Sequence, residues 1–260
     1  MPRRAAARAP RNGPAPLRSA LRLLSRDSAS GSLSRSAFET IRAAIVHGRF
    51  DFGEPLSETE LAGALGISKG PVRTALRELQ INGLVEIVPQ SATYVFRASR
   101  EQIRELGDFR LVLESEAIRL AVEHAAPALL ADLRRIIGLM SRAAASANRM
   151  QTKLLDTQFH QTFILHSGNS YLVSSYDTIV QLVDALRYRV LDTIVYRNRA
   201  FEEHKRMVAF LERGKVSAAI SVLRKHIERT KQFHGSVDWG HGRARRKDYR
   251  FRNYREALER

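Results

Sequence analysis

The stretch PLSETELAGALGISKGPVRTALRELQINGLV, residues 55–85, decides the fold of the N-terminal part of this chain. Ser57 and Glu60 have the spacing of a capping box, which begins a short helix, and Gly66 is a natural end for that helix. Ser68 has the position of an N-cap for a second helix. Two short helices joined by Gly-Ile-Ser predict a helix-turn-helix.

The residues on either side of this stretch complete a small domain. Phe38, Ile41 and Ile45 recur at helical spacing and predict a helix ahead of the pair. The sequence LVEIVPQSATYVFRA, residues 84–98, alternates around a Pro-Gln-Ser turn and predicts a two-stranded hairpin. Three helices followed by a hairpin indicate a winged helix-turn-helix, which we expect over residues 35–98.

The second helix of the pair opens with residues that suit DNA. In a helix-turn-helix this helix enters the major groove N-terminus first, so its first side chains must be small, polar or cationic. Here they are Ser68, Lys69, Gly70 and Arg73. The free N–H groups of the first turn can hold a phosphate, and the two cations can reach guanine edges or the backbone. The alternative is a three-helix unit with cations on its surface.

The ordered framework Leu-Ala, Leu-Gly-Ile-Ser, Pro-Val-Arg, Ala-Leu and Gly-Leu-Val resembles the N-terminal signature of GntR-family transcriptional regulators. This resemblance implies a homodimer that binds a palindromic operator in double-stranded DNA. Carried over by position, it implies DNA contacts at Ser57, Thr59, Ser68, Lys69, Gly70, Arg73, Gln90 and Ser91. Thr59 stands where the family often has arginine, Lys69-Gly70 replaces Arg-Thr, and the wing tip lacks the customary glycine, so the operator sequence stays open.

The net charge suggests a polyanionic partner, but much of it lies at the chain ends. The 260 residues carry a net charge of +16. Residues 1–34 account for +6 and residues 240–260 for +5. We therefore expect a disordered basic tail at 1–34 and a second basic tail at 237–260. The Arg-rich, acid-poor start also resembles an organellar transit peptide.

Composition excludes several classes of protein. The chain has no cysteine, which rules out disulfides and thiolate ligands and suits a reducing cytosol. No run approaches the roughly 18 apolar residues of a membrane span. We expect a bacterial cytoplasmic protein that associates with the nucleoid when bound to DNA.

The remainder of the chain has the pattern of long amphipathic helices. We expect helices at 101–124, 127–146, 151–167, 170–193, 198–213 and 216–234. Six helices without a strand pattern predict an antiparallel bundle over residues 99–236. The predicted fold is thus mainly α, a winged helix-turn-helix followed by an antiparallel six-helix bundle.

Asp156 and His160 lie one helical turn apart and share a face. Alone, the pair could be half of a metal site, an acid/base couple or an ordinary polar contact. His204 and His226 face inward on two helices joined near Gly214, ten residues before it and twelve after it, so their imidazoles should lie level. Three histidines and a carboxylate suit Zn²⁺, Ni²⁺, Mn²⁺ or Fe²⁺, and hydrogen-bonded core residues are the alternative.

The segments FRLVLESEAIRLA, DTQFHQTFILHSGNSYL and EEHKRMVAFLERGKVSAAISVLRKHI resemble the FCD (FadR C-terminal domain) branch of the GntR family, in its metal-binding, VanR-like six-helix version. The resemblance implies an effector and dimerisation domain that binds small organic acids. It implies a divalent transition metal held by Asp156, His160, His204 and His226.

Three arginines are candidates for binding the effector. Arg110 matches a position typical of the FCD branch and could pair a carboxylate bidentately. Arg187 and Arg189 are further candidates on the fourth helix. Each could instead be a salt-bridge partner, Arg110 with Glu114 for instance.

The features together predict a transcriptional regulator, a repressor by resemblance, whose operator affinity changes when a small carboxylate binds at the metal site. A helical metalloenzyme is the runner-up, because a His₃-Asp site with open positions could activate water. The sequence offers no obvious second general base, so we do not expect an enzyme. A metal that only holds the bundle together is the third possibility.

Overall fold

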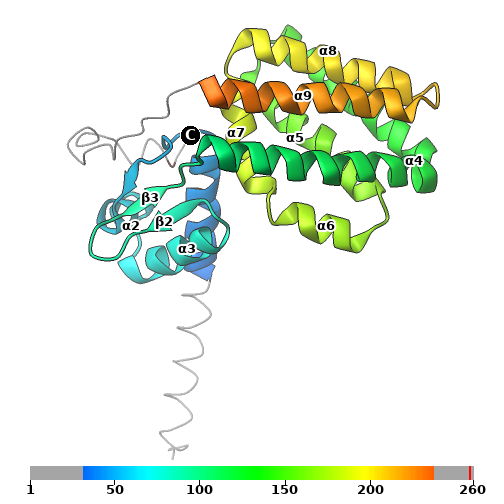
Figure 1. The fold of residues 1–260 in the computed structure, drawn as a ribbon. Coiled ribbons are helices and arrows are strands. Elements are labelled where there is room, and N and C mark those ends of the chain that lie inside the picture. The colour runs from blue at the N-terminus through cyan, green and yellow to red at the C-terminus, as the bar shows by residue number, and fades with distance from the viewer. Residues whose placement is uncertain (1–31, 237–257, 259–260) are drawn as a thin grey trace, which may run out of the picture.

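The computed structural model describes residues 32–236 and residue 258. The expected basic tails, 1–34 and 237–260, therefore lie almost entirely outside the described residues. At the N-terminal boundary, residues 32–46 form one helix, so residues 32–34 belong to the folded domain and not to a tail. The prediction of a mainly α chain is confirmed (Figure 1).

The N-terminal half is a winged helix-turn-helix. After the helix at 32–46, the order is β1 (Pro55–Leu56), α2 (Glu58–Leu65), α3 (Lys69–Ile81), β2 (Val85–Ile87) and β3 (Thr93–Val95). The expected antiparallel hairpin is formed by β2 and β3. The other edge of β3 pairs with β1, which completes a sheet of order β1-β3-β2. The sequence did not predict β1, because two residues that include a proline give no alternating pattern.

The turns in this half follow the expected capping. The Ser57 hydroxyl accepts a hydrogen bond from the Glu60 N–H, and Gly66 ends α2 with a left-handed φ of 67°. Ser68 is the N-cap of α3, and within residues 32–236 its side chain makes no capping hydrogen bond, which leaves the hydroxyl available. At the wing tip Gln90 takes a left-handed φ of 57°, the conformation for which glycine is usual.

The C-terminal half consists of long helices (Figure 1). They are α4 (Arg100–Ala145), α5 (Arg149–His166), α6 (Ser170–Asp177), α7 (Val180–Val190), α8 (Ile194–Leu211) and α9 (Val216–Ser236). The two helices expected before and after residue 125 form α4, which bends at Ala125 (φ −144°, ψ 30°), two residues before Pro127. Within the described residues no helix is long and apolar enough to span a bilayer.

One expected helix is wrong. The span 170–193 is two helices, α6 and α7, separated at Thr178 and Ile179. Both residues are β-branched, which weakens a helix, and the Thr178 hydroxyl donates to the Ser175 carbonyl at 2.7 Å. Neither is a glycine or proline, so no residue pattern predicts this break.

Buried apolar residues form two clusters, and α7 contributes to both. The first cluster belongs to the winged helix-turn-helix but includes Ala185, Leu186 and Tyr188 of α7. The second lies among the helices of the bundle and includes Val183 of the same helix. The winged helix-turn-helix and the bundle therefore share packed side chains across α7, and this packing joins them directly.

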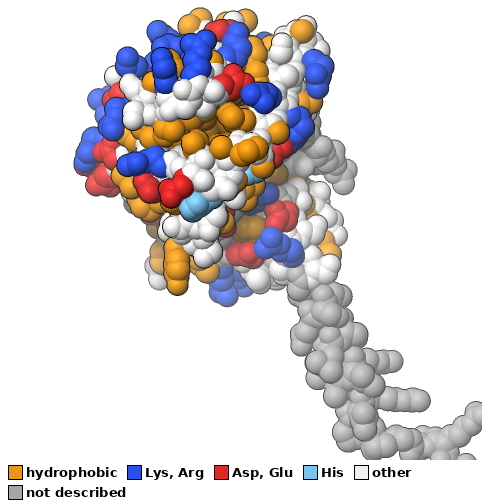
Figure 2. Space-filling model, turned by 90° about the vertical axis from the view of Figure 1, so that its right-hand side faces the viewer, with side chains coloured by type: hydrophobic (Ala, Val, Ile, Leu, Met, Phe, Trp, Pro, Cys, Tyr) orange, Lys and Arg blue, Asp and Glu red, His pale blue; other side chains and the backbone are white. Residues whose placement is uncertain are grey.

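Acidic and basic side chains are interspersed on the end of the bundle (Figure 2). Lys and Arg gather along the upper edge, over α8 and α9, with Asp and Glu among them. On this face of the described chain, the field is mixed in sign, unlike the single-sign surface that attracts nucleic acid.

Ser99 begins α4 with a complete capping box. Its hydroxyl accepts from the Gln102 N–H at 3.1 Å, and the Gln102 side chain accepts from the Ser99 N–H at 2.8 Å. Because α4 leads directly from the winged helix-turn-helix into the bundle, this cap stabilises the junction.

We predict that Ser99→Ala lowers the free energy of unfolding by about 1 kcal/mol, measured by urea denaturation, because the Gln102 N–H loses its hydroxyl acceptor. Ser99→Asp keeps an oxygen acceptor and should be close to wild type. Equal stability of the alanine variant and wild type would contradict this role of the cap.

Candidate metal centre and nucleic-acid interface

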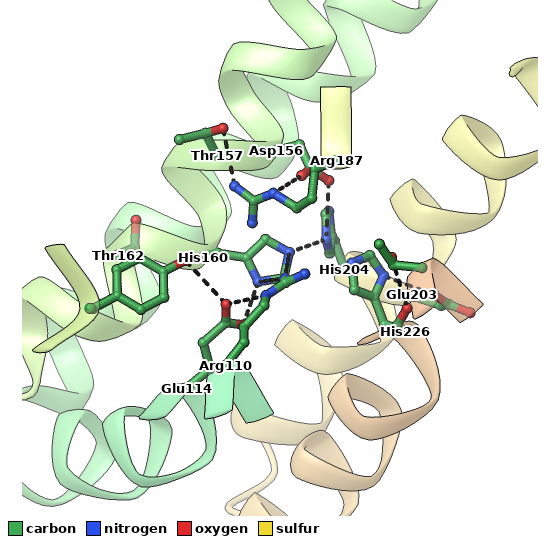
Figure 3. Close-up of polar contacts among 12 residues, drawn as sticks. Arg110, Glu114, Asp156, Thr157, His160, Thr162, Arg187, Glu203, His204 and His226 are labelled. Carbon is green, nitrogen blue, oxygen red and sulfur yellow. Dashed lines mark hydrogen bonds and ion pairs between the residues drawn. The ribbon is translucent and has the colours of Figure 1, made fainter. Parts of the chain in front are cut away.

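Four buried residues from three helices meet in the bundle (Figure 3). Asp156 and His160 come from α5, His204 from α8 and His226 from α9. One candidate ligand atom from each residue lies within 4.8 Å of the others. The ring centroids of the three histidines form a triangle with sides of 5.1 Å. The structure thus brings together all four residues that the sequence proposed as ligands.

The α8–α9 hairpin explains this convergence. Gly214 turns the chain with a left-handed φ of 67°, and α8 packs along α9. Because His204 and His226 are nearly equidistant from this turn, they lie level across the hairpin. The helical turn of α5 that carries Asp156 and His160 completes the cluster.

Burial keeps the three imidazoles neutral. It lowers the pKa of His160 to about 3, although the Glu114 carboxylate opposes this shift. It lowers the pKa of His226 to about 4, with the Arg110 charge adding to the effect. The pKa of His204 lies well below its usual value because of burial and the adjacent imidazoles. Neutral imidazole is the form that binds metal ions, so the donor set fits a divalent cation.

Two glutamates orient the imidazoles. His160 Nδ1 donates to Glu114 Oε2 at 2.8 Å, and His226 Nδ1 donates to Glu203 Oε2 at 3.0 Å. These contacts set the tautomer and leave Nε2 as the lone-pair atom on both rings. Imidazole ligands of metal ions are usually held in this way.

His204 and Asp156 retain unused polar atoms. His204 Nε2 lies 3.3 Å from His160 Nε2 and 3.6 Å from Asp156 Oδ1. His204 Nδ1 is buried, and no hydrogen-bond partner for it is found in the described part of the chain; buried Asp156 Oδ2 has an ion pair with Arg187 Nε but no hydrogen bond there. A cation at this point would be held by lone pairs of the three rings and of the carboxylate.

Arg110 lies against this cluster, paired with Glu114. Its Nε donates to Glu114 Oε1 at 2.6 Å, and its Nη2 lies 3.2 Å from both ring nitrogens of His160. Tyr176 also donates to Glu114, at 3.2 Å. Burial alone would raise the pKa of Glu114, but Arg110 and His160 outweigh it and hold the pKa well below its usual value.

The other two candidate arginines have different surroundings. Arg187 Nε lies 3.3 Å from Asp156 Oδ2, and its Nη2 donates to Asp184 and Thr157. Within residues 32–236, its buried Nη1 has no hydrogen-bond partner. Arg189 is not in the cluster, because its guanidinium donates to the Phe50 carbonyl in the winged helix-turn-helix at 2.8 Å.

A narrow pocket of about 20 Å³ adjoins the cluster. Its wall includes Asp156, Arg187, Glu203, His226 and Arg229. Arg229 forms an ion pair with Glu203. The volume suits about one water molecule, so an organic acid would bind here only if the wall moved.

The expected DNA contacts lie on the surface of the N-terminal half. Ser68, Lys69 and Arg73 are exposed at the start of α3. Figure 1 places the helix α3 away from α8 and α9. Gly70 lies among them, and Thr59, Gln90 and Ser91 are also exposed, whereas Ser57 is half-buried as the cap of α2. Arg73 Nη2 pairs with Glu58 Oε2 at 2.9 Å, so DNA would have to share or displace this contact.

Two family descriptions match this architecture. Residues 33–95 match "Bacterial regulatory proteins, gntR family", and residues 105–229 match the FCD domain. The chain is a GntR-family regulator with an FCD domain.

Two relatives of this GntR-family regulator are named as repressors. The probable D-xylose utilization operon transcriptional repressor of Paenarthrobacter nicotinovorans is 29% identical over 188 residues, covering 70% of this chain and 80% of the relative. The gluconate operon transcriptional repressor of Bacillus subtilis is 26% identical over 174 residues, covering 67% and 70%. These relatives are named as regulators, not enzymes.

Solved structures share the fold of the GntR-family regulator. A GntR transcriptional regulator from Rhodococcus sp. RHA1 aligns with a TM-score of 0.69 and 20% identity, covering 80% of this chain and 100% of the other. Escherichia coli McbR/YncC aligns with a TM-score of 0.65 and 21% identity, covering 77% and 96%. At these identities the similarity concerns the fold alone.

The sequence did not single out the two orienting glutamates of this FCD domain. Glu114 appeared only as a salt-bridge partner for Arg110, and Glu203 was not considered. Glu203 precedes His204 directly but contacts His226 on the neighbouring helix, so only the packing of α8 on α9 reveals its role. Glu114 lies on α4 and reaches His160 on α5.

We predict that Glu114→Gln lowers the free energy of unfolding by about 3–5 kcal/mol, because Arg110 would remain buried without its charge partner. The matched control is Glu116→Gln, two residues later, since Glu116 pairs with Arg119 on the surface. The control should change stability by about 0–1 kcal/mol. Similar unfolding curves for both variants would contradict the importance of the buried pair.

Proposed function

We propose that this GntR-family regulator is a homodimeric repressor whose affinity for a palindromic operator depends on a divalent transition metal and a small carboxylate bound at the FCD cluster. The observation that carries the proposal is the buried convergence of three neutral imidazoles and one carboxylate. Zn²⁺, Ni²⁺, Mn²⁺ and Fe²⁺ suit this donor set.

The residues divide into ligands and supports. Asp156, His160, His204 and His226 would hold the ion. Glu114 and Glu203 fix the tautomers of two imidazoles and make them better donors. When bound, the metal supplies positive charge and open positions for oxygen ligands.

An anionic effector has a further partner in Arg187. Its Nη1 is buried without a hydrogen-bond partner in residues 32–236, beside the pocket that Asp156 and His226 line. A carboxylate there would satisfy the guanidinium and replace the weak contact with Asp156. The relative in Bacillus subtilis is a repressor of a gluconate operon, and gluconate is a hydroxy acid of the class that would fit this chemistry.

DNA recognition falls to α3 and the wing. Lys69 and Arg73 are exposed cations at the N-terminus of α3, and in the described part of the chain the Ser68 side chain makes no capping hydrogen bond. This arrangement places point charges and donors where a helix enters the major groove. Thr59, Gln90 and Ser91 supply contacts from α2 and the wing.

We predict that His204→Ala/His226→Ala abolishes Zn²⁺ binding, measured by titration calorimetry on metal-free protein. In wild type, Zn²⁺ with gluconate should change affinity for DNA selected from a random library, measured by fluorescence anisotropy, whereas the double variant should not respond. His166→Ala is the matched control, because His166 is also on α5 but pairs with Asp132 outside the cluster.

Two outcomes would contradict this model. One is an operator response in the double variant equal to that of wild type. The other is a wild type whose melting temperature falls on chelation while operator binding stays constant with and without gluconate, since the metal would then only hold the helices together.

We predict that Arg73→Ala weakens binding to the selected operator by about 1–3 kcal/mol at fixed salt, because a base-contacting or phosphate-contacting cation is lost. Arg135→Ala is the control, since Arg135 pairs with Asp132 on the surface of the bundle. Wild-type affinity of the Arg73 variant would refute the placement of α3 in the groove.

A further inference from the structure

Two arginines of the short helix α7 point in opposite directions. Arg187 and Arg189 are two residues apart, which places them about 200° apart around the helix. Arg187 reaches the metal cluster through Asp156. Arg189 reaches the winged helix-turn-helix through Phe50. One rigid element thus contacts both candidate binding sites.

The contact with the winged helix-turn-helix is specific. Arg189 Nη2 donates to the Phe50 carbonyl at 2.8 Å, and its guanidinium carbon lies 3.6 Å from the centre of the Phe52 ring. The adjacent Tyr188 stacks on His47 with ring centroids 4.9 Å apart. Burial lowers the pKa of Arg189 to about 10, which still leaves the side chain charged at neutral pH.

The segment that Arg189 holds leads directly into the wing. The Gly53 N–H donates to the Val95 carbonyl at 3.0 Å, and the Val95 N–H donates to the Glu54 carbonyl at 2.9 Å. Residues 53 and 54 therefore pair with β3, one of the two wing strands. A displacement of residues 47–54 would move a strand that carries a DNA-contacting tip.

Two more contacts tie α7 to the helices that supply the metal ligands. His234 Nε2, two turns beyond His226 on α9, donates to the Leu186 carbonyl at 3.1 Å. Lys153, on α5 one turn before Asp156, pairs with Asp192 at 2.5 Å and lies 5.4 Å from the Tyr188 ring. The position of α7 therefore depends on both α5 and α9.

We propose that α7 is the relay between the FCD cluster and the wing, with Arg187 as its input and Arg189 as its output. This inference rests on the proposed metal site. A ligand that binds Asp156 competes with Arg187 for the Asp156 carboxylate. Arg187 then keeps its ion pair with Asp184, to which its Nη2 already donates at 2.7 Å. The resulting shift of α7 changes how Arg189 holds residues 50–52.

The test is hydrogen exchange by mass spectrometry on the full chain, metal-free and with Zn²⁺ alone. Protection of residues 154–160 and 200–207 reports binding at the cluster. The relay predicts that exchange in residues 48–54 also changes, by about fivefold or more. Residues 139–145, at the far end of α4, report any general stabilisation of the chain.

Variants separate the relay from the metal site. Arg189→Met should keep the response of residues 154–160 and lose the response of residues 48–54, because it removes the hydrogen bonds to the Ala185 and Phe50 carbonyls and the charge over Phe52. Arg189→Lys, a milder change, should reduce the second response, since an ammonium cannot reach two carbonyls and the ring together. Arg135→Met, on the surface, should behave as wild type.

The outcomes are distinguishable. No protection of residues 154–160 by Zn²⁺ in wild type would mean that the proposed metal site has failed. Protection there with unchanged exchange at 48–54, or a full response at 48–54 in both Arg189 variants, would overturn the relay while leaving the metal site intact.

Discussion

Charges inside the bundle must be neutralised by neighbouring side chains, because burial removes them from bulk water, and this constraint organises the rest of the structure. Glu114 is completely buried and pairs with Arg110, and Asp156 is paired with Arg187. The three histidines avoid the free-energy cost of burying a charge because they remain neutral. Neutral imidazoles and a carboxylate with spare lone pairs at one point form a site that a cation would complete. The buried polar groups that lower the stability of the core therefore also allow it to bind a ligand.

The arrangement of helices connects this site to the DNA-binding half of the chain. α5, α8 and α9 supply the ligand candidates, and α7 lies between them and the segment that precedes β1. Since packed side chains are shared across α7, a change in the bundle can alter the placement of the wing. We propose that the binding of a small molecule changes operator affinity along this path, by as much as the ligand prefers one arrangement over the other.

Local patterns predicted a large part of the molecule. Ser57, Gly66 and the alternation at 84–98 sufficed for the winged helix-turn-helix, because caps and turns act over a few residues. The level positions of His204 and His226 followed from counting residues around Gly214. The features that were missed depend on contacts between distant elements: β1 needs β3 to exist, and Glu203 orients an imidazole on another helix. Arg189 was grouped with Arg187 in the sequence, yet helical geometry points it at Phe50.

The most direct test of the metal site is X-ray absorption at the zinc edge of the full chain, reconstituted with one equivalent of Zn²⁺. We expect imidazole nitrogens at about 2.0–2.1 Å, with oxygen completing the coordination sphere. His204→Ala/His226→Ala should lose most of this imidazole signal. A spectrum of water oxygens without imidazole scattering, or an unchanged spectrum in the double variant, would contradict a metal site at Asp156, His160, His204 and His226.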